Sequence, residues 1–375
     1  MMSCKTMPSC RIAWIDAWRA MLIVLVVAGH VFGMVAHYVP ACNAGCYEFM
    51  FKGIYSFHMP AFFMLAGMMT SDVARGGAFF FWKSSRRLLV PYFFFGLVGA
   101  VVYLILMPYF GRGFVGSTGY YDQFAGGDWW HPWVSLLYGA TFPGTDGFRC
   151  NSVLWFLPCL FSVKMIGVLF LRMVGPAIRN TRSVVLVILL IVFLGWASQF
   201  APLPSLPYGL SKVLWYSPFF LTGYCLRSIL LESSAKGGFM TKSFRFAMCV
   251  PMLVMFSILL WSIPDIVFSR PDLRWYIVAV ALGVLGSFLS MGVAMKMPRR
   301  FSCICFQLST TSIGIMFLHK YIVLGMMVVP GVKGLLASSL PVGLVISLTI
   351  VTVSTAVAWV ISACARRVAP WTIGA

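Results

Sequence analysis

Acidic residues are scarce in this sequence: only 9 of its 375 residues are Asp or Glu. Charged residues of both signs make up 10% of the chain and hydrophobic residues 61%, whereas an average soluble domain carries about 25% charged residues. This lack of charge excludes an ordinary soluble protein. The mean hydropathy of +0.91 indicates a chain that crosses a lipid bilayer many times.

The eleven cysteines include no CxxC pair, the spacing that is typical of structural zinc sites. We therefore expect no metal, and we interpret most of the cysteines as small buried hydrophobic side chains. Cys42, Cys46 and Cys150 are an open case, because a disulfide among them requires that their side of the membrane is oxidising.

The net charge of +19 is the feature that would point to a nucleic-acid partner. However, the basic residues stand in short clusters between apolar runs. That distribution is typical of the loops that orient a membrane protein. We therefore expect the chain to lie in a lipid bilayer and to bind no nucleic acid.

Ten apolar segments are candidates for membrane spans, which need about 20 residues each. They predict an all-α fold with one integral membrane domain over residues 1–375. The first segment is interpreted as a retained span, because Lys5 and Arg11 precede it and no small-residue cleavage site follows. The ten segments lie near residues 20–39, 53–71, 88–108, 153–171, 184–200, 213–230, 246–264, 276–295, 306–327 and 342–363, the ninth with a polar start at 309–312.

The distribution of Lys and Arg predicts that both termini are cytoplasmic. In that orientation 18 of the 28 basic residues fall in cytoplasmic segments and 7 on the opposite side, while Arg19, Lys164 and Lys320 lie in spans or at their edges. Basic residues favour the cytoplasmic side of short loops. We expect a multi-pass protein of the cell inner or plasma membrane.

One predicted extracytoplasmic loop, about residues 109–152, is too long for a simple connection. Its Gly, Pro and Asp residues indicate turns, and Tyr120, Trp129 and Trp130 offer flat aromatic faces. These aromatic side chains either bind the substrate or belong to the belt that Trp and Tyr form at membrane interfaces.

The first span carries two polar residues, Arg19 and His30. Eleven residues correspond to about three helical turns, so the two side chains project from the same face, about 16 Å apart along the axis. Ionisable groups at such depth are costly and usually face a bundle interior or an aqueous cavity. Taken singly, Arg19 could reach the interface with its long side chain and His30 could hydrogen-bond a neighbouring helix, but their shared face favours one polar track.

Two further histidines lie in predicted spans, His58 and His319. Each one alone is explained by a structural hydrogen bond. Three of the chain's five histidines within spans nevertheless indicate a buried polar site.

A basic cluster, Lys83 with Arg86 and Arg87, stands where the third span is expected to begin. It is either the ordinary positive charge of a cytoplasmic loop or a phosphate-binding patch, since the forked donors of arginine suit phosphate oxygens.

Five segments of the chain carry recognisable motifs: WIDAWRAMLIVLVVAGH (14–30), FHMPAFFMLAG (57–67), KSSRRLLVPYF (83–93), LWFLPCLF (154–161) and IGIMFLHKY (313–321). Together they resemble the acyltransferase 3 family of integral membrane acyltransferases, and most closely its sugar O-acetylases, a branch that includes fucose 4-O-acetylase-like proteins. The resemblance covers about residues 11–367. Ala20 and Ala66 depart from the glycine and serine that are common at those positions, which changes packing and removes no polar site residue.

The resemblance implies O-acyl transfer from a cytoplasmic acyl-CoA, with acetyl-CoA as the expected donor, to a hydroxyl of a cell-envelope or exported carbohydrate. His30 would be the general base, since the imidazole pKa suits proton transfer near neutral pH. Arg19, Lys83, Arg86 and Arg87 would bind the CoA phosphates, and Asp16 would orient Arg19. His58 and His319 would orient the acceptor or shuttle a proton.

Two other classes of function remain open from the residues. A transporter or flippase of a lipid-linked glycan would also need many spans and buried polar groups, but the sequence has no internal repeat and the predicted spans hold no acidic residue for ion coupling. A non-catalytic partner in a glycan-assembly complex would not depend on His30.

Overall fold

The computed structural model of the chain describes residues 12–37, 39–70, 77–115, 131–139, 149–174, 181–200, 206–227, 230, 242–262 and 272–374. Over these residues the chain is helical and contains no β-strand, as the sequence predicts. It divides into two compact units. The first unit comprises Met1–Leu65 and Ser228–Ala363, and the second comprises Ala66–Arg227 and Cys364–Ala375.

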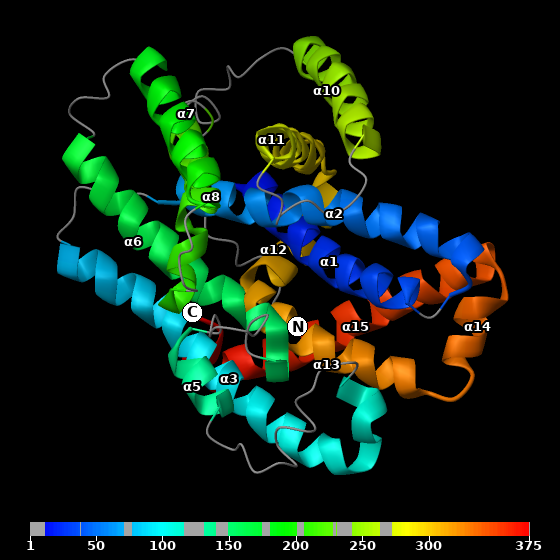
Figure 1. The fold of residues 1–375 in the computed structure, drawn as a ribbon. Coiled ribbons are helices and arrows are strands. Elements are labelled where there is room, and N and C mark those ends of the chain that lie inside the picture. Colours follow the sequence, from blue (N-terminus) through cyan, green and yellow to red (C-terminus); the bar gives the residue numbers. More distant parts are fainter. Residues whose placement is uncertain are drawn as a thin grey trace. The chain divides into compact units, whose positions relative to one another are not determined.

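In the first unit, helix α1 (Ala13–Ala36) packs against three helices from the C-terminal part of the sequence: α11 (Leu273–Met295), α12 (Ser302–Thr310) and α13 (Ser312–Val328) (Figure 1). The core of this unit therefore joins two distant parts of the chain. The other elements are α2 (Ala41–Met68), whose last turn belongs to the second unit, α10 (Lys242–Ser262), the 3₁₀ turn η5 (Arg299–Phe301), α14 (Val332–Ser338) and α15 (Leu340–Val368).

Two glycines let α2 approach the backbone of α1 closely. A Cβ atom at Gly29 would lie 2.8 Å from the Tyr55 ring, and one at Gly33 would lie 2.9 Å from the Phe51 ring. Gly29 and Gly33 are four residues apart, as are Phe51 and Tyr55, so each pair lies on one helix face. This small-xxx-small spacing is a common way to pack helices within membranes, and it brings Tyr55 next to the residue that follows Gly29, which is His30.

The predicted ninth span is broken in the structure. Its helix stops at Thr310, restarts at Ser312, and the two parts α12 and α13 meet at 77°. The break falls in the polar run Ser309–Ser312, where the hydroxyls of Thr310 and Thr311 hydrogen-bond backbone carbonyls of the preceding turn. Side-chain hydrogen bonds of this kind compete with the hydrogen bonds of the helix backbone. The helix therefore bends at the polar residues of this predicted span.

Helix α11 begins at a side-chain cap that lies just outside the apolar segment. The Asp272 carboxylate accepts hydrogen bonds from the backbone N–H of Arg274 and, at 3.0 Å, from its guanidinium. These hydrogen bonds hold the pKa of the Asp272 carboxyl below its ordinary value. The cap satisfies an otherwise unpaired N–H of the first turn and fixes where the helix starts.

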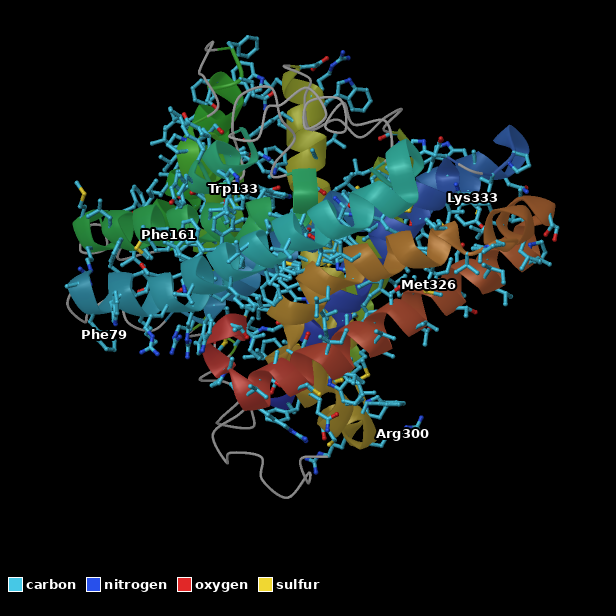
Figure 2. The ribbon with its side chains drawn as sticks, turned by 90° about the horizontal axis from the view of Figure 1, so that it is seen from below. Phe79, Trp133, Phe161, Arg300, Met326 and Lys333 are labelled. Atoms are coloured by element: carbon cyan, nitrogen blue, oxygen red, sulfur yellow. The ribbon has the colours of Figure 1, made fainter. Side chains whose placement is uncertain are left out.

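The second unit is built around helices α3 and α6, which run side by side and are marked by Phe79 and Phe161 in Figure 2. Their ring contact between Phe81 and Phe161 spans 5.6 Å. Its elements are α3 (Gly77–Val115), α5 (His131–Leu137), η2 (Arg149–Trp155), α6 (Phe156–Val174), α7 (Thr181–Ala197), η3 (Pro207–Lys212), α8 (Val213–Arg227) and η6 (Pro370–Ile373).

Helix α3 begins eleven residues before the predicted start near residue 88. The basic cluster of Lys83, Arg86 and Arg87 therefore lies within this helix, and the expectation that it ends a loop is wrong. A helical stretch of exposed aromatic residues precedes it, Phe79, Phe81 and Trp82. Aromatic and basic side chains at a helix end are typical of a membrane–water interface.

Three contacts within the second unit join segments that the sequence predicts to be cytoplasmic. An Arg172 guanidinium nitrogen lies 3.1 Å from the Cβ position of Gly77, and Arg227 donates a hydrogen bond to the Met68 carbonyl. The C-terminal Gly374, with a positive φ of 70°, packs against the Arg87 carbonyl. Each contact therefore joins two segments with the same predicted side of the membrane, while that side stays a prediction.

Among the described helices, five are long and apolar enough to cross a membrane: Ala13–Ala36, Gly77–Val102, Asn151–Met173, Leu273–Met295 and Leu340–Val368. The bent pair α12–α13 gives a sixth, and Val185–Ala197 and Val250–Ser262 are shorter apolar helices. A multi-pass membrane protein is thus supported by length and composition, while the count of ten spans and the cytoplasmic termini remain predictions.

Gly67, the last residue of the FHMPAFFMLAG segment, occupies a position with no room for a side chain. A Cβ atom there would overlap the carbonyl oxygen of Phe220 in α8. Because that obstacle is backbone, we expect Gly67→Ala to lower the apparent melting temperature in detergent by several degrees and to reduce the yield of folded protein.

Gly325 is the matched control for this prediction. It also lies inside a helix, and a Cβ atom there would meet nothing within 4 Å. Since alanine favours helix more than glycine does, Gly325→Ala should leave the melting temperature unchanged or raise it slightly. Equal melting temperatures for Gly67→Ala and the wild type would contradict the packing argument.

Candidate active site

Three of the sequence-predicted site residues converge in the first unit. His30 of α1 and His319 of α13 lie with their ring centroids 5.2 Å apart. The hydroxyl oxygen of Tyr55, from α2, lies 3.1 Å from Nδ1 of His30 and 3.4 Å from its Nε2. The Tyr55 ring in turn lies 4.7 Å from the His58 ring, also on α2. Helices α1, α2 and α13 thus build one cluster of three histidines and a tyrosine.

His58 and His319 are held in the same way. Nδ1 of His58 lies 2.8 Å from the Ile54 carbonyl oxygen, and Nδ1 of His319 lies 3.0 Å from that of Ile315, in each case one helical turn earlier. A carbonyl oxygen only accepts, so Nδ1 carries the hydrogen and Nε2 presents its lone pair in the neutral ring. Each ring therefore offers a proton-accepting nitrogen away from its own helix.

His319 has a further property that the sequence does not show. Its side chain is fully buried, and its Nε2 has no hydrogen-bond partner among the residues that the structure describes. A buried polar atom without a partner is costly and calls for an explanation in a native structure. Together with the two neighbouring histidines, this nitrogen makes His319 a candidate site residue.

Arg19 and Asp16 lie at the other end of the same face of α1. The buried Asp16 carboxylate accepts a hydrogen bond of 2.6 Å from the Ser309 hydroxyl of α12, and Trp18 donates one of 2.9 Å to Ser290 of α11. These contacts fix the rotation of α1 about its axis. With the rotation fixed, Arg19 is half-buried and His30 reaches His319.

The basic cluster predicted to bind phosphate belongs to the second unit. Arg86 and Arg87 are exposed, and the Lys83 ammonium lies 5.6 Å from the centre of the Phe79 ring. The cluster is therefore open to a ligand within its own unit. The structure does not relate it in space to Arg19 or to the histidines.

Other sequence-predicted residues fall outside the described part of the chain. Tyr120, Trp129 and Trp130 lie in residues 116–130, and the side chains of Cys42 and Cys150 are likewise not described. Cys46 is a free, exposed thiol. Within the described residues, no three His, Cys, Asp or Glu side chains form a group that could hold a metal ion.

Comparison with known families identifies the family of the chain. The model of an acyltransferase domain, acyltransferase 3, matches residues 12–363. The chain belongs to the acyltransferase 3 family. Searches of curated proteins and of solved structures return no significant match.

Membership in the acyltransferase 3 family supports membrane acyl transfer as the general activity, and the histidine cluster lies within the matched residues. Sequence reasoning missed two residues that the structure places at or near the candidate site, Tyr55 and Ser309. Tyr55 precedes His58 by three residues, so helical spacing alone places both on one face of α2. Ser309 gave no such signal, since its partner Asp16 is 293 residues away.

Proposed function

We propose that this acyltransferase 3 protein moves an acyl group, acetyl by preference, from acyl-CoA on the cytoplasmic side to a hydroxyl of a cell-envelope or exported carbohydrate. The observation that carries the proposal is the convergence of His30, His58 and His319 from three helices of a family of acyltransferases. A glycan transporter has no need of clustered proton-accepting rings and is disfavoured by the family.

The chemical step requires one base and one leaving group. A ring nitrogen of His30 accepts the proton of the acceptor hydroxyl, and the oxygen attacks the thioester carbonyl. The tetrahedral intermediate then collapses, the carbon–sulfur bond breaks, and the proton passes from the imidazolium to the CoA thiolate. The products are the O-acyl carbohydrate and free CoA, and the histidine returns to its neutral form.

His319 and His58 would act on the acceptor. Each presents Nε2 as an acceptor atom, which suits a sugar hydroxyl as hydrogen-bond donor. Lys320 directly follows His319 in α13, so its positive charge lies near the histidine cluster. A positive charge near the carbonyl of the thioester would stabilise the oxyanion that forms during attack.

The donor would be held by its phosphates. Arg19 on α1 and Lys83, Arg86 and Arg87 on α3 are all predicted to face the cytoplasm, where acyl-CoA is made. Guanidinium groups bind phosphate oxygens through paired hydrogen bonds. The aromatic residues Tyr120, Trp129 and Trp130 of the long loop would bind the carbohydrate on the opposite side.

The proposal is tested with purified protein in liposomes, acetyl-CoA labelled in the acetyl group and a cell-envelope glycan fraction. We expect label in the glycan and its release by mild alkali, since an ester is cleaved under conditions that leave an amide intact. In the same assay, Arg86→Ala and Arg87→Ala should raise KM for acetyl-CoA about tenfold each, because a charge-assisted contact is lost.

Succinyl-CoA and a longer acyl-CoA in parallel reactions distinguish the acyl group. Arg300→Ala is the control variant for the arginine substitutions. Arg300 is exposed and is not among the residues proposed to bind the CoA phosphates, so its substitution should leave KM for acetyl-CoA unchanged. Absence of alkali-labile label with every donor, from protein that is folded by thermal shift, would reject acyl transfer to carbohydrate.

A further inference from the structure

His30 differs from the other two histidines in how its ring is held. Backbone carbonyls of their own helices fix His58 and His319. For His30, the hydrogen-bond partner within the described residues is the Tyr55 hydroxyl, which comes from another helix. The orientation of the ring that the proposed reaction uses as base is thus set by a side chain of α2.

Tyr55 is itself held on three sides. Its ring lies against the backbone of α1 at Gly29, where a Cβ atom would be only 2.8 Å away. It also contacts Phe51 at 4.0 Å and His58 at 4.7 Å between ring centroids. The phenol therefore has little freedom to turn, and the imidazole adjusts to it. A rotamer locked by packing is what a residue needs in order to position another.

We propose that Tyr55 is a positioning residue that orients His30 for proton transfer, an assignment that rests on the proposed function. In this assignment the nearer ring nitrogen, Nδ1, carries the hydrogen and donates it to the Tyr55 oxygen at 3.1 Å. Nε2 then keeps its lone pair for the acceptor hydroxyl. When His30 takes the proton, the same oxygen accepts a hydrogen bond from the charged imidazolium and stabilises it. A neutral phenol does this without a second buried charge, which the apolar surroundings would penalise.

The first test is Tyr55→Phe, which removes one oxygen atom and keeps the ring that packs on Gly29. We expect kcat for acyl transfer to fall about 10- to 100-fold, by analogy with groups that orient the histidine ligands of metal ions. KM for acyl-CoA and for the glycan should stay within about twofold, because Tyr55 touches neither substrate in this assignment.

Tyr47 provides a matched control on the same helix. It also packs its ring on α1, against Phe32 at 6.2 Å, and it is fully buried. Its hydroxyl has no hydrogen-bond partner among the described residues. Tyr47→Phe should therefore keep the wild-type kcat. Equal kcat values for Tyr55→Phe and Tyr47→Phe would overturn the assignment.

A second measurement does not depend on acyl transfer. Nitrogen NMR of protein with ¹⁵N-labelled histidine rings reports which ring nitrogen carries hydrogen, and the His30 signals are identified by their loss in His30→Gln. We expect Tyr55→Phe to shift the His30 signals and to leave those of His58 and His319 in place. If the His30 signals do not move, the positioning role is rejected even where transfer activity is present. If the His30 signals do move in a protein that transfers no acyl group, the proposed function is rejected, while the hydrogen bond between Tyr55 and His30 is supported.

Discussion

Replacing His30 with glutamine should lower kcat for acyl transfer by about 10²- to 10⁴-fold, the range that a positioned general base contributes. Glutamine retains hydrogen-bonding capacity and similar length but cannot take a proton near neutral pH. The substitution also removes the ring contacts of His30 with Tyr55 and His319. KM for the donor should change little, because the CoA phosphates are assigned to Arg19 and to the cluster of α3.

His37 is the control for this substitution. It lies seven residues after His30, at the C-terminal end of α1, and is exposed. His37→Gln should show wild-type kcat and a wild-type melting temperature. The measurement is the initial rate of alkali-labile label transfer at saturating donor. A His30→Gln protein that folds and transfers at the wild-type rate would remove His30 from the reaction and, with it, the proposed mechanism.

Much of this arrangement can be read from the sequence because helical periodicity is a local rule. It places Arg19 and His30 on one face of α1, three turns apart, and the apolar density of the segments predicts the helices themselves. The histidines at positions 58 and 319 stand out for their burial in apolar runs. The five motif segments identify the family before any geometry is known, and the match over residues 12–363 confirms it.

Periodicity does not say which helices are neighbours, and this is where the sequence fell short. The contact of Asp16 with Ser309 and that of His30 with His319 join residues nearly 300 positions apart. The break at Thr311 turns one predicted span into two helices at 77°. Tyr55 is one aromatic residue among many in α2, and only its distance from His30 distinguishes it.

Gly29 and Gly33 show how a local feature acquires its meaning from the fold. In the sequence they are two small residues in an apolar run. In the structure they let the rings of Tyr55 and Phe51 lie directly on α1. His30 directly follows Gly29, and the Tyr55 side chain that packs on Gly29 contacts its ring. Packing and the proposed chemistry therefore depend on one short segment, residues 29–33.

Replacing His319 with leucine should separate stability from activity. Nε2 of His319 is fully buried without a partner among the described residues, so leucine removes a costly unsatisfied atom. The Ile315 carbonyl loses the hydrogen bond from Nδ1 but keeps the backbone hydrogen bond of helix α13. We therefore expect the melting temperature of His319→Leu in detergent to equal or exceed that of the wild type. The rate of acyl transfer should nevertheless fall at least about 100-fold, because the substrate hydroxyl loses its acceptor atom.

Residues of functional sites often support activity at a cost in stability. A buried polar atom whose hydrogen-bond partner arrives with the substrate is one way in which this happens. Tyr47→Phe removes another buried polar atom without a described partner, away from the cluster, and should share the effect on melting temperature while keeping full activity. If His319→Leu lost stability and activity together, the histidine would be a packing residue. If it kept full activity, Nε2 would have no part in the reaction. A protein that is as stable as the wild type and inactive is the result that places His319 against the substrate.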